Sequence, residues 1–326
     1  MNDNNINLDD HQKILALMKD LKDPYSEARK KSAETLGKMG QVAKDSVPSL
    51  IEALWDKDVG VRRTAIIALG EIGDPRAIPE LVRELDSYAL PYVAEEALAK
   101  FGPDSIPAII QLLNQKAELD GHAHAISVLG MVGDAQIVPT LITYLLQHPR
   151  RDARSAAAGA LAAIRDPEAI PALIYAVTHD VEFVRMMAGP CLAQFGKEAV
   201  PALVETLETT SPFGNPYVME ALGKIGDPQA VPALEKKLLH SNQYVRMWAA
   251  RALGEIGDRQ SVTALVQALV DNSLNVRREA VYALGKIDDP RIRLILEERL
   301  PKEPFDGVYS EISYVLKKIN SQMKKE

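Results

Sequence analysis

The stretch from Leu69 to Pro79 reads LGEIGDPRAIP, and variants of it recur along the whole chain. Two of the clearest are LGKIGDPQAVP from Leu222 and LGMVGDAQIVP from Leu129. The leucine that opens each copy recurs every 29 to 33 residues, at Leu36, Leu69, Leu98, Leu129, Leu161, Leu192, Leu222, Leu253, Leu284 and Leu316. A fixed period of this size indicates an array of stacked repeats.

Small and apolar residues surround each marker leucine at helical spacing. Ala65 and Ile72 lie four residues before and three residues after Leu69, and Ala249 and Ile256 surround Leu253 in the same way. Steps of three and four place residues on one face of a helix. We therefore predict one helix per repeat, called helix B, whose small residues let the next helix approach closely.

A glycine follows this helix in most repeats and predicts where it ends. These glycines are Gly40, Gly73, Gly102, Gly133, Gly196, Gly226 and Gly257. Glycine takes the left-handed conformation that ends helices at little cost. We expect Asp288 and Asn320 to replace it in two other repeats. Arg165 fits this conformation least well, so we expect a differently built helix end there.

Aspartate and proline after the glycine predict the next helix, called helix A. Aspartate caps helices and proline suits their first turn, as at Asp74-Pro75. A second proline, such as Pro79, lies one turn further on and predicts that the first turn breaks and the helix restarts. An amphipathic run such as IPELVREL then continues helix A. The sequence thus predicts an all-α protein, an α-solenoid of about ten antiparallel helix pairs.

The repeat resembles the HEAT family and, more narrowly, the HEAT-like repeat named after the phycobilisome lyases. The resemblance rests on the LGxIGDP runs and on four Val-Arg pairs, at Val61-Arg62, Val184-Arg185, Val245-Arg246 and Val276-Arg277. It covers roughly Leu8 to Asn320 and implies an armadillo-like helical superhelix. Such repeats occur in bilin-attachment lyases, in accessory domains of enzymes and in many scaffolds, so the fold alone does not define the function.

The chain shows no Gly/Ser-rich linker between repeats. We therefore expect residues 1–8 to be flexible, residues 9–320 to form a single continuous repeat domain, and residues 321–326 to form a polar C-terminal tail. No apolar run of membrane length and no signal-peptide pattern is present, which favours a cytoplasmic protein. The lone Cys191 excludes an internal disulfide and is expected to be a buried, inert thiol.

An arginine near the start of helix B recurs in six repeats. These are Arg29, Arg62, Arg154, Arg185, Arg246 and Arg277. The family resemblance implies that they form a structural ladder of hydrogen bonds between repeats, together with the preceding aspartates. Pro91, His122, Asn215 and Tyr309 replace the arginine elsewhere. Three of those repeats have irregular turns, which are either looser or shaped to meet a partner.

The two positions after this arginine are expected, by analogy with HEAT stacks, to face the concave side. Residues there and one turn further on form the predicted partner-binding set: Tyr92, His124, Met186, Met187, Tyr217, Met247, Trp248, Arg251 and Tyr282. Aromatic residues, methionine and arginine are enriched in interface cores, and methionine adapts to varied partners. The alternative is that the methionines and Trp248 fill gaps between repeats. Pro190, inside a predicted helix B, would kink it, either opening a pocket or leaving a packing defect.

Catalytic and cofactor-binding patterns do not emerge from the sequence. The six histidines are scattered, no His-Glu dipeptide occurs, and His122 and His124 should point in different directions on one helix. We therefore expect no catalytic residues, no metal and no cofactor. The net charge of −7 argues against a nucleic-acid groove, which needs clustered lysine and arginine.

Two hypotheses for the function follow. The first is a non-catalytic scaffold that holds another protein or peptide on the concave face. The second, which the family resemblance implies, is a phycobilin lyase or a chaperone for bilin attachment to phycobiliproteins. In that case the arginines would pair with bilin propionates and the aromatic residues would stack on the pigment. The same surface fits both hypotheses.

Overall fold

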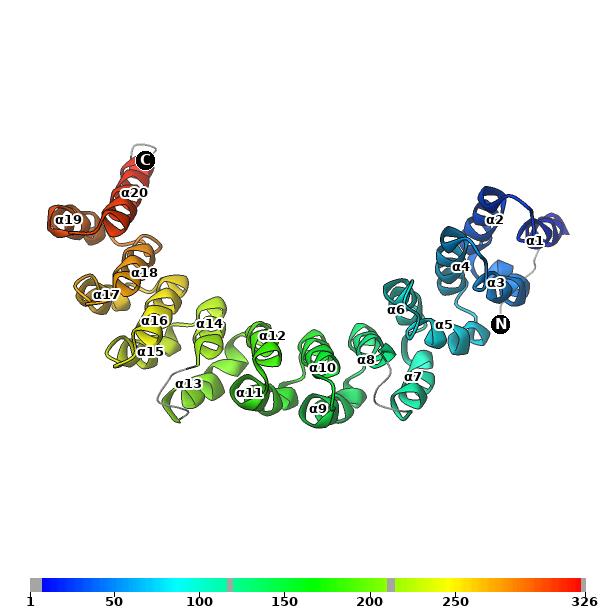
Figure 1. The fold of residues 1–326 in the computed structure, drawn as a ribbon, viewed down its shortest axis with the longest axis horizontal. Coiled ribbons are helices and arrows are strands. Elements are labelled where there is room, and N and C mark those ends of the chain that lie inside the picture. The colour runs from blue at the N-terminus through cyan, green and yellow to red at the C-terminus, as the bar shows by residue number, and fades with distance from the viewer. Residues whose placement is uncertain (1–7, 116–119, 210–214, 324–326) are drawn as a thin grey trace. The chain divides into compact units, whose positions relative to one another are not determined.

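The computed structural model describes residues 8–115, 120–209 and 215–323, which form helices and no strands (Figure 1). Each odd-numbered α-helix is followed by an even-numbered partner, from α1 to α20. The predicted all-α solenoid of about ten helix pairs is therefore confirmed. The expected flexible segment 1–8 falls outside the described residues except for Leu8, which begins α1. The end of the expected tail, residues 324–326, also lies outside them.

The chain splits into two compact units, residues 1–164 and 165–326, and each is described by itself. The expected single continuous domain over 9–320 stays a prediction. Within each unit, the first helices of the pairs form one row and the second helices form another, called the A layer and the B layer (Figure 1).

In the first unit, the A layer comprises α1 (Leu8–Asp20), α3 (Val47–Ala53), α5 (Ile78–Glu84), α7 (Ile106–Leu113) and α9 (Val138–Gln147). Its B layer comprises α2 (Ser26–Lys38), α4 (Val59–Ile72), α6 (Pro91–Ala99), α8 (Gly121–Val132) and α10 (Arg151–Ile164).

In the second unit, the A layer comprises α11 (Ile170–His179), α13 (Val200–Thr209), α15 (Val231–Leu238), α17 (Val262–Ala268) and α19 (Arg291–Arg299). Its B layer comprises α12 (Glu182–Ala193), α14 (Pro216–Ile225), α16 (Gln243–Ile256), α18 (Leu274–Leu284) and α20 (Asp306–Met323).

The core of each unit lies between the two layers and between successive B-layer helices. The marker leucines are buried there, and Leu69 and Leu253 are completely inaccessible. Each buried leucine stabilises the fold by roughly 1.5–3 kcal/mol relative to an exposed one. Successive B helices pack closely because their facing positions carry glycine and alanine. A Cβ atom on Gly254 of α16 would lie 2.5 Å from the Cα of Ala283 on α18.

The predicted helix ends are confirmed at the glycines. All seven glycines that follow helix B have φ between 56° and 74°. The carboxylate of Asp74 accepts a hydrogen bond from the backbone N–H of Arg76, and a 3₁₀ turn from Pro75 to Ala77 precedes α5. The same order of capping aspartate, 3₁₀ turn and α-helix recurs at Asp166 and Asp227. These local signals therefore set the entry to helix A.

Three other helix ends differ from expectation. Arg165 itself takes φ of 60°, the left-handed conformation we expected it to avoid, because it occupies the position before the capping aspartate where other repeats carry a left-handed glycine. Helix α18 already ends at Leu284 and Gly285 has φ of −66°, so Asp288 does not end it. Helix α20 continues past Asn320 to Met323, since no further helix packs back on it within the described residues.

Candidate functional site

The predicted partner-binding residues of the second unit lie on successive B-layer helices. Met186 and Met187 project from α12, Tyr217 from α14, Met247 and Trp248 from α16, and Tyr282 from α18. We call these six residues the second-unit patch. Met186, Met187 and Tyr282 are 46%, 41% and 37% exposed, whereas Tyr217, Met247 and Trp248 are half-buried. The patch is therefore an accessible apolar surface whose middle is partly embedded between helices.

Two cations of this surface are already paired with its own aromatic and acidic residues. The Arg251 guanidinium lies 5.4 Å from the ring centroid of Trp248, and its Nε lies 3.2 Å from a carboxylate oxygen of Glu279 on α18. The Lys286 ammonium lies 4.9 Å from the ring centroid of Tyr282 and 2.6 Å from a Glu255 carboxylate oxygen. Both cations are compensated by glutamates beside the patch, so the six patch residues themselves offer apolar area rather than charge.

Tyr217 joins α14 to α12. Its hydroxyl donates a hydrogen bond to the carboxylate of Glu182, which also pairs with Arg185. The hydrogen bond to Glu182 raises the pKa of Tyr217 and lowers the pKa of Glu182. A Cβ atom on Gly189 would lie 3.0 Å from the Cβ of Tyr217, so the helices touch here. Tyr217 therefore fills space between repeats and also shows part of its ring to solvent.

Pro190 lies inside α12, next to this contact. Proline has no backbone N–H, so α12 lacks one hydrogen-bond donor there. Cys191 beside it is buried, as expected, and burial raises the pKa of its thiol to about 11. A thiol in that state is a poor nucleophile at neutral pH.

Tyr92 and His124 belong to the first unit, where they form a polar cluster with two residues that sequence reasoning missed. The carboxylate of Glu95 on α6 is hydrogen-bonded to Nδ1 of His124 and accepts a hydrogen bond of 2.7 Å from the hydroxyl of Ser127. The rings of Tyr92 and His124 meet edge to face with centroids 5.0 Å apart. Glu95 is only 4% exposed, whereas Tyr92 is 71% exposed.

A signal for this cluster was present in the repeat. The position three residues before the marker leucine faces the next repeat and is apolar in the neighbouring helices, as at Ile66 and Ile126. Glu95 occupies that position in α6. A carboxylate there needs partners because burying an unpaired charge is costly.

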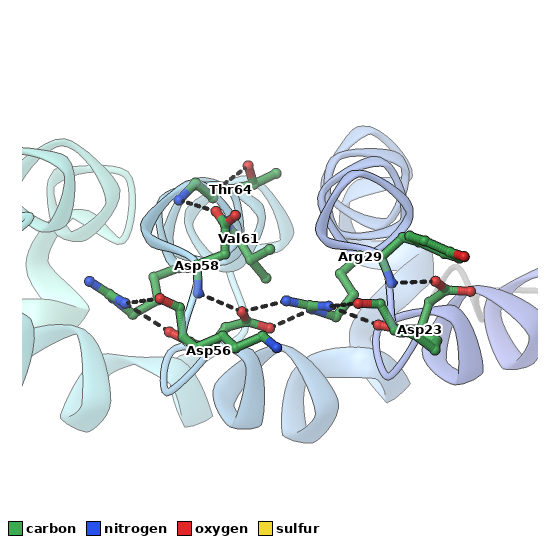
Figure 2. A network of polar contacts seen from close by, with 11 residues as sticks. Asp23, Arg29, Asp56, Asp58, Val61 and Thr64 are labelled. Carbon is green, nitrogen blue, oxygen red and sulfur yellow. Dashed lines mark hydrogen bonds and ion pairs between the residues drawn. The ribbon is translucent and has the colours of Figure 1, made fainter.

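The arginines at the start of the B-layer helices share one contact (Figure 2). Arg29 donates from Nη1 to the backbone carbonyl of Asp23, six residues earlier, at 2.8 Å. The same contact at 2.8 Å joins Arg62 to Asp56, Arg154 to His148, Arg246 to His240, and Arg277 to Asp271. Each arginine thus closes the turn between helix A and helix B of its own repeat.

Three of these arginines also reach the next repeat. Arg29 donates two hydrogen bonds to the carboxylate of Asp56, at 2.6 and 2.7 Å, and lowers the pKa of that carboxyl (Figure 2). Arg246 contacts Asp271 and Arg277 contacts Glu303 in the same two-pronged way.

Elsewhere other contacts take the place of the ladder. Arg185 departs from the pattern by pairing with Glu182 three residues earlier. Asn215, which replaces the arginine, donates from its amide to the carbonyl of Val177 at 2.7 Å. Asp86 accepts a hydrogen bond of 2.9 Å from the backbone N–H of Gly121.

His122 points away from His124, as predicted, and contacts His148. Nδ1 of His122 lies 3.0 Å from Nε2 of His148, and both rings are buried. The backbone N–H of Arg150 donates to Nδ1 of His148, so a neutral His148 carries its proton on Nε2 and donates it to His122. Across the described ranges, no group of three or more His, Cys, Asp or Glu residues is arranged to hold a metal ion.

Comparison with known proteins agrees with this architecture. The family model for HEAT repeats matches residues 14–102, 106–189 and 235–317. The chain belongs to the HEAT-repeat family. The model for the PBS lyase HEAT-like repeat matches residues 217–240. A comparison with curated proteins gives no match. None of the described helices of this HEAT-repeat protein has the length and apolar character needed to cross a membrane.

Three solved structures show similarity to this chain. The karyopherin Kap121p bound to the SUMO protease Ulp1p is 13% identical with a TM-score of 0.61, over 92% of this chain and 40% of that one. Human deoxyhypusine hydroxylase is 23% identical with a TM-score of 0.32, over 84% and 96% of the two chains. The CpcE–CpcF complex of phycocyanin lyase from Nostoc sp. PCC7120 is 21% identical with a TM-score of 0.31, over 94% of each chain. The karyopherin similarity supports the fold alone.

Proposed function

We propose that this HEAT-repeat protein is a non-catalytic scaffold that binds an amphipathic helix of a partner protein on the second-unit patch. The observation that carries the proposal is an apolar row of Met, Tyr and Trp side chains on four successive B-layer helices. Methionine and aromatic side chains dominate interface cores, and the methionine side chain adapts to the shape of a partner. A helix laid along such a row would present apolar residues at three- and four-residue spacing.

The electrostatics of the patch support an apolar mode of recognition. Arg251 and Lys286 are each held by a glutamate of the neighbouring helix, so they offer little uncompensated charge to a partner. Binding through this surface should therefore depend weakly on salt, because screening acts mainly on uncompensated charges.

The test begins with a photo-crosslinking amino acid at Met187, which captures the partner in cells for identification. The purified partner is then titrated calorimetrically against wild type, Met187→Ala, Trp248→Ala and Tyr175→Ala. Tyr175 is an exposed aromatic residue of α11 in the A layer and serves as the matched control. We expect Trp248→Ala to weaken binding by about tenfold or more, as for an interface hot spot, and Tyr175→Ala to leave it unchanged. Equal affinity for all four proteins would refute the proposal.

The match of residues 217–240 to the PBS lyase HEAT-like repeat supports a second candidate, a phycobilin lyase or bilin-attachment chaperone acting on phycobiliproteins. That segment begins with Tyr217 of the patch. Titration with phycocyanobilin, followed by visible absorption, separates the two candidates. Pigment binding that is lost in both Trp248→Ala and Arg251→Ala, followed by transfer to an apo-phycobiliprotein, would establish the second. An unchanged spectrum leaves the protein-binding scaffold.

A further inference from the structure

A groove of about 1150 Å³ runs between α2 and α4 on the B layer of the first unit. Its floor is smooth because the two helices meet through small residues: a Cβ atom on Gly37 would lie 2.9 Å from the Cα of Ala68. Ile67, which is 40% exposed, contributes apolar surface to the groove lining. The groove therefore exists because the repeat requires close helix packing at this position and places no bulky side chain there.

The acidic residues that line this groove are already neutralised. Lys30 pairs with Glu27, Lys38 pairs with Glu34 at 2.6 Å, and Lys100 pairs with Glu71 at 2.5 Å. Each pair is at least partly exposed and contributes little to stability. Because of these three ion pairs, every carboxylate that lines the groove already has a cationic partner.

Two cations of the groove remain unmatched. Lys31 of α2 and Arg63 of α4 are both exposed, and neither side chain contacts a carboxylate among residues 8–115, 120–209 and 215–323. They line the groove from the two neighbouring helices α2 and α4. This contrasts with the second-unit patch, where both Arg251 and Lys286 are paired. On a protein of net charge −7, an uncompensated pair of cations in a groove favours an acidic ligand at this place.

We propose that the α2–α4 groove binds an acidic peptide segment of a partner protein, with one carboxylate on Lys31, another on Arg63 and an apolar side chain over Ile67. Lys31 and Arg63 project from neighbouring helices, whose axes lie roughly 8–10 Å apart when packed. Glutamates two turns apart on one face of a peptide helix are separated by about 10.8 Å along its axis, a span that the long lysine and arginine side chains can reach. The site lies in the first unit and does not depend on the function proposed for the second-unit patch.

The experiment uses the full chain and a fluorescein-labelled helical peptide with two glutamates two turns apart and a leucine between them. The comparison peptide has lysines in place of the glutamates. Fluorescence anisotropy is measured for wild type, for Lys31→Glu/Arg63→Glu, and for Lys19→Glu/Lys44→Glu. The last variant makes the same change in net charge outside the groove lining and is the matched control. Thermal unfolding followed by circular dichroism shows whether each variant is folded.

We expect the glutamate peptide to bind wild type and the control equally, and to bind the groove variant roughly tenfold more weakly, since reversing two charges replaces attraction with repulsion. The lysine peptide should not bind wild type, added salt should weaken the glutamate complex, and Trp248→Ala should leave it unchanged. The proposal is overturned if wild type does not bind the glutamate peptide. It is also overturned if the two double variants lose affinity equally, or if a folded groove variant keeps wild-type affinity.

Discussion

The carboxylate of Glu95 on α6 is buried against Nδ1 of His124 on α8, 29 residues further along the chain. Ser127 donates to the second oxygen of the same carboxylate. One repeat thus places a charged group at a position that is apolar in its neighbours, and the next repeat supplies both partners. The stability of this arrangement depends on the pair rather than on either residue alone.

Removing the His124 side chain alone should therefore destabilise the folded protein. We expect His124→Ala to lower the free energy of unfolding by about 1–3 kcal/mol, because Glu95 keeps its burial but loses its main partner. Adding Glu95→Ile, which restores the apolar residue of Ile66 and Ile126, should recover most of the loss. Urea unfolding of the two single variants and the double variant measures the coupling. Additive effects would show that the two residues do not depend on each other.

The buried pair of His122 and His148 should make the first unit sensitive to mild acid. Burial lowers the pKa of both imidazoles, and the neighbouring His122 lowers that of His148 further. The unfolded chain then binds more protons than the folded chain below the ordinary histidine pKa of about 6.5. The free energy of unfolding should consequently fall as the pH drops below about 6.5, until the lowered folded-state pKa values are reached.

Hydrogen exchange of α8 and α9 at about pH 7.5 and about pH 5.5, corrected for intrinsic exchange, tests this expectation. Wild type should lose protection at the lower pH. A double variant with His122→Gln and His148→Gln should show a smaller change, and the exposed His179→Gln control should behave like wild type. A pH response that persists unchanged in the double variant would assign it to other groups.

The arginine contacts should differ in how much they contribute to the free energy of unfolding. Arg29 and Asp56 have side chains only 7% and 12% exposed, whereas those of Arg185 and Glu182 are 37% and 65% exposed. We expect Arg29→Met to destabilise by about 3 kcal/mol, because it strands a buried carboxylate and frees the turn carbonyl. Arg185→Met should cost at most about 1 kcal/mol, as for an exposed pair. Denaturant unfolding of both variants provides the comparison, and similar costs would contradict it.

Arg165 offers a test of backbone conformation. Its φ of 60° costs a residue with a Cβ atom about 1–2 kcal/mol, a cost that glycine avoids. Arg165→Gly should therefore raise the free energy of unfolding by about 1 kcal/mol, after allowing for the greater freedom of glycine in the unfolded chain. Arg165→Ala keeps the Cβ atom and should bring no gain. A stabilisation by alanine equal to that by glycine would place the effect in the arginine side chain instead.

Much of the fold could be read from short stretches of sequence. The glycines with positive φ, the Asp74 cap and the 3₁₀ turn at Pro75 all depend on contacts within a few residues, and repetition made each signal stronger. The predictions at Arg165 and Asp288 were wrong. Residue preference favoured other positions, but Arg165 takes φ of 60° directly before the capping Asp166, and α18 already ends at Leu284.

The candidate site depended on more distant contacts. The sequence placed Met187, Trp248 and Tyr282 at the helix B positions expected to face the concave side, and whether they bind a partner stays a prediction. It did not show that Arg251 would be paired with Glu279, or that Lys31 and Arg63 would stay unmatched. Those outcomes depend on which side chains of adjacent repeats meet, some 30 residues apart in the chain, where charge and geometry decide among several possible partners.

The sequence by itself therefore determined the repeat, the helix pairs and most helix ends, because a period of 29 to 33 residues and the local chemistry of Gly, Asp and Pro are written in the chain. Only the tertiary structure decided which charges are neutralised, which aromatic residues are embedded, and where Glu95 finds its partners. Packing brings the B-layer helices into contact, and side chains from neighbouring repeats then compete for the same hydrogen bonds and ion pairs.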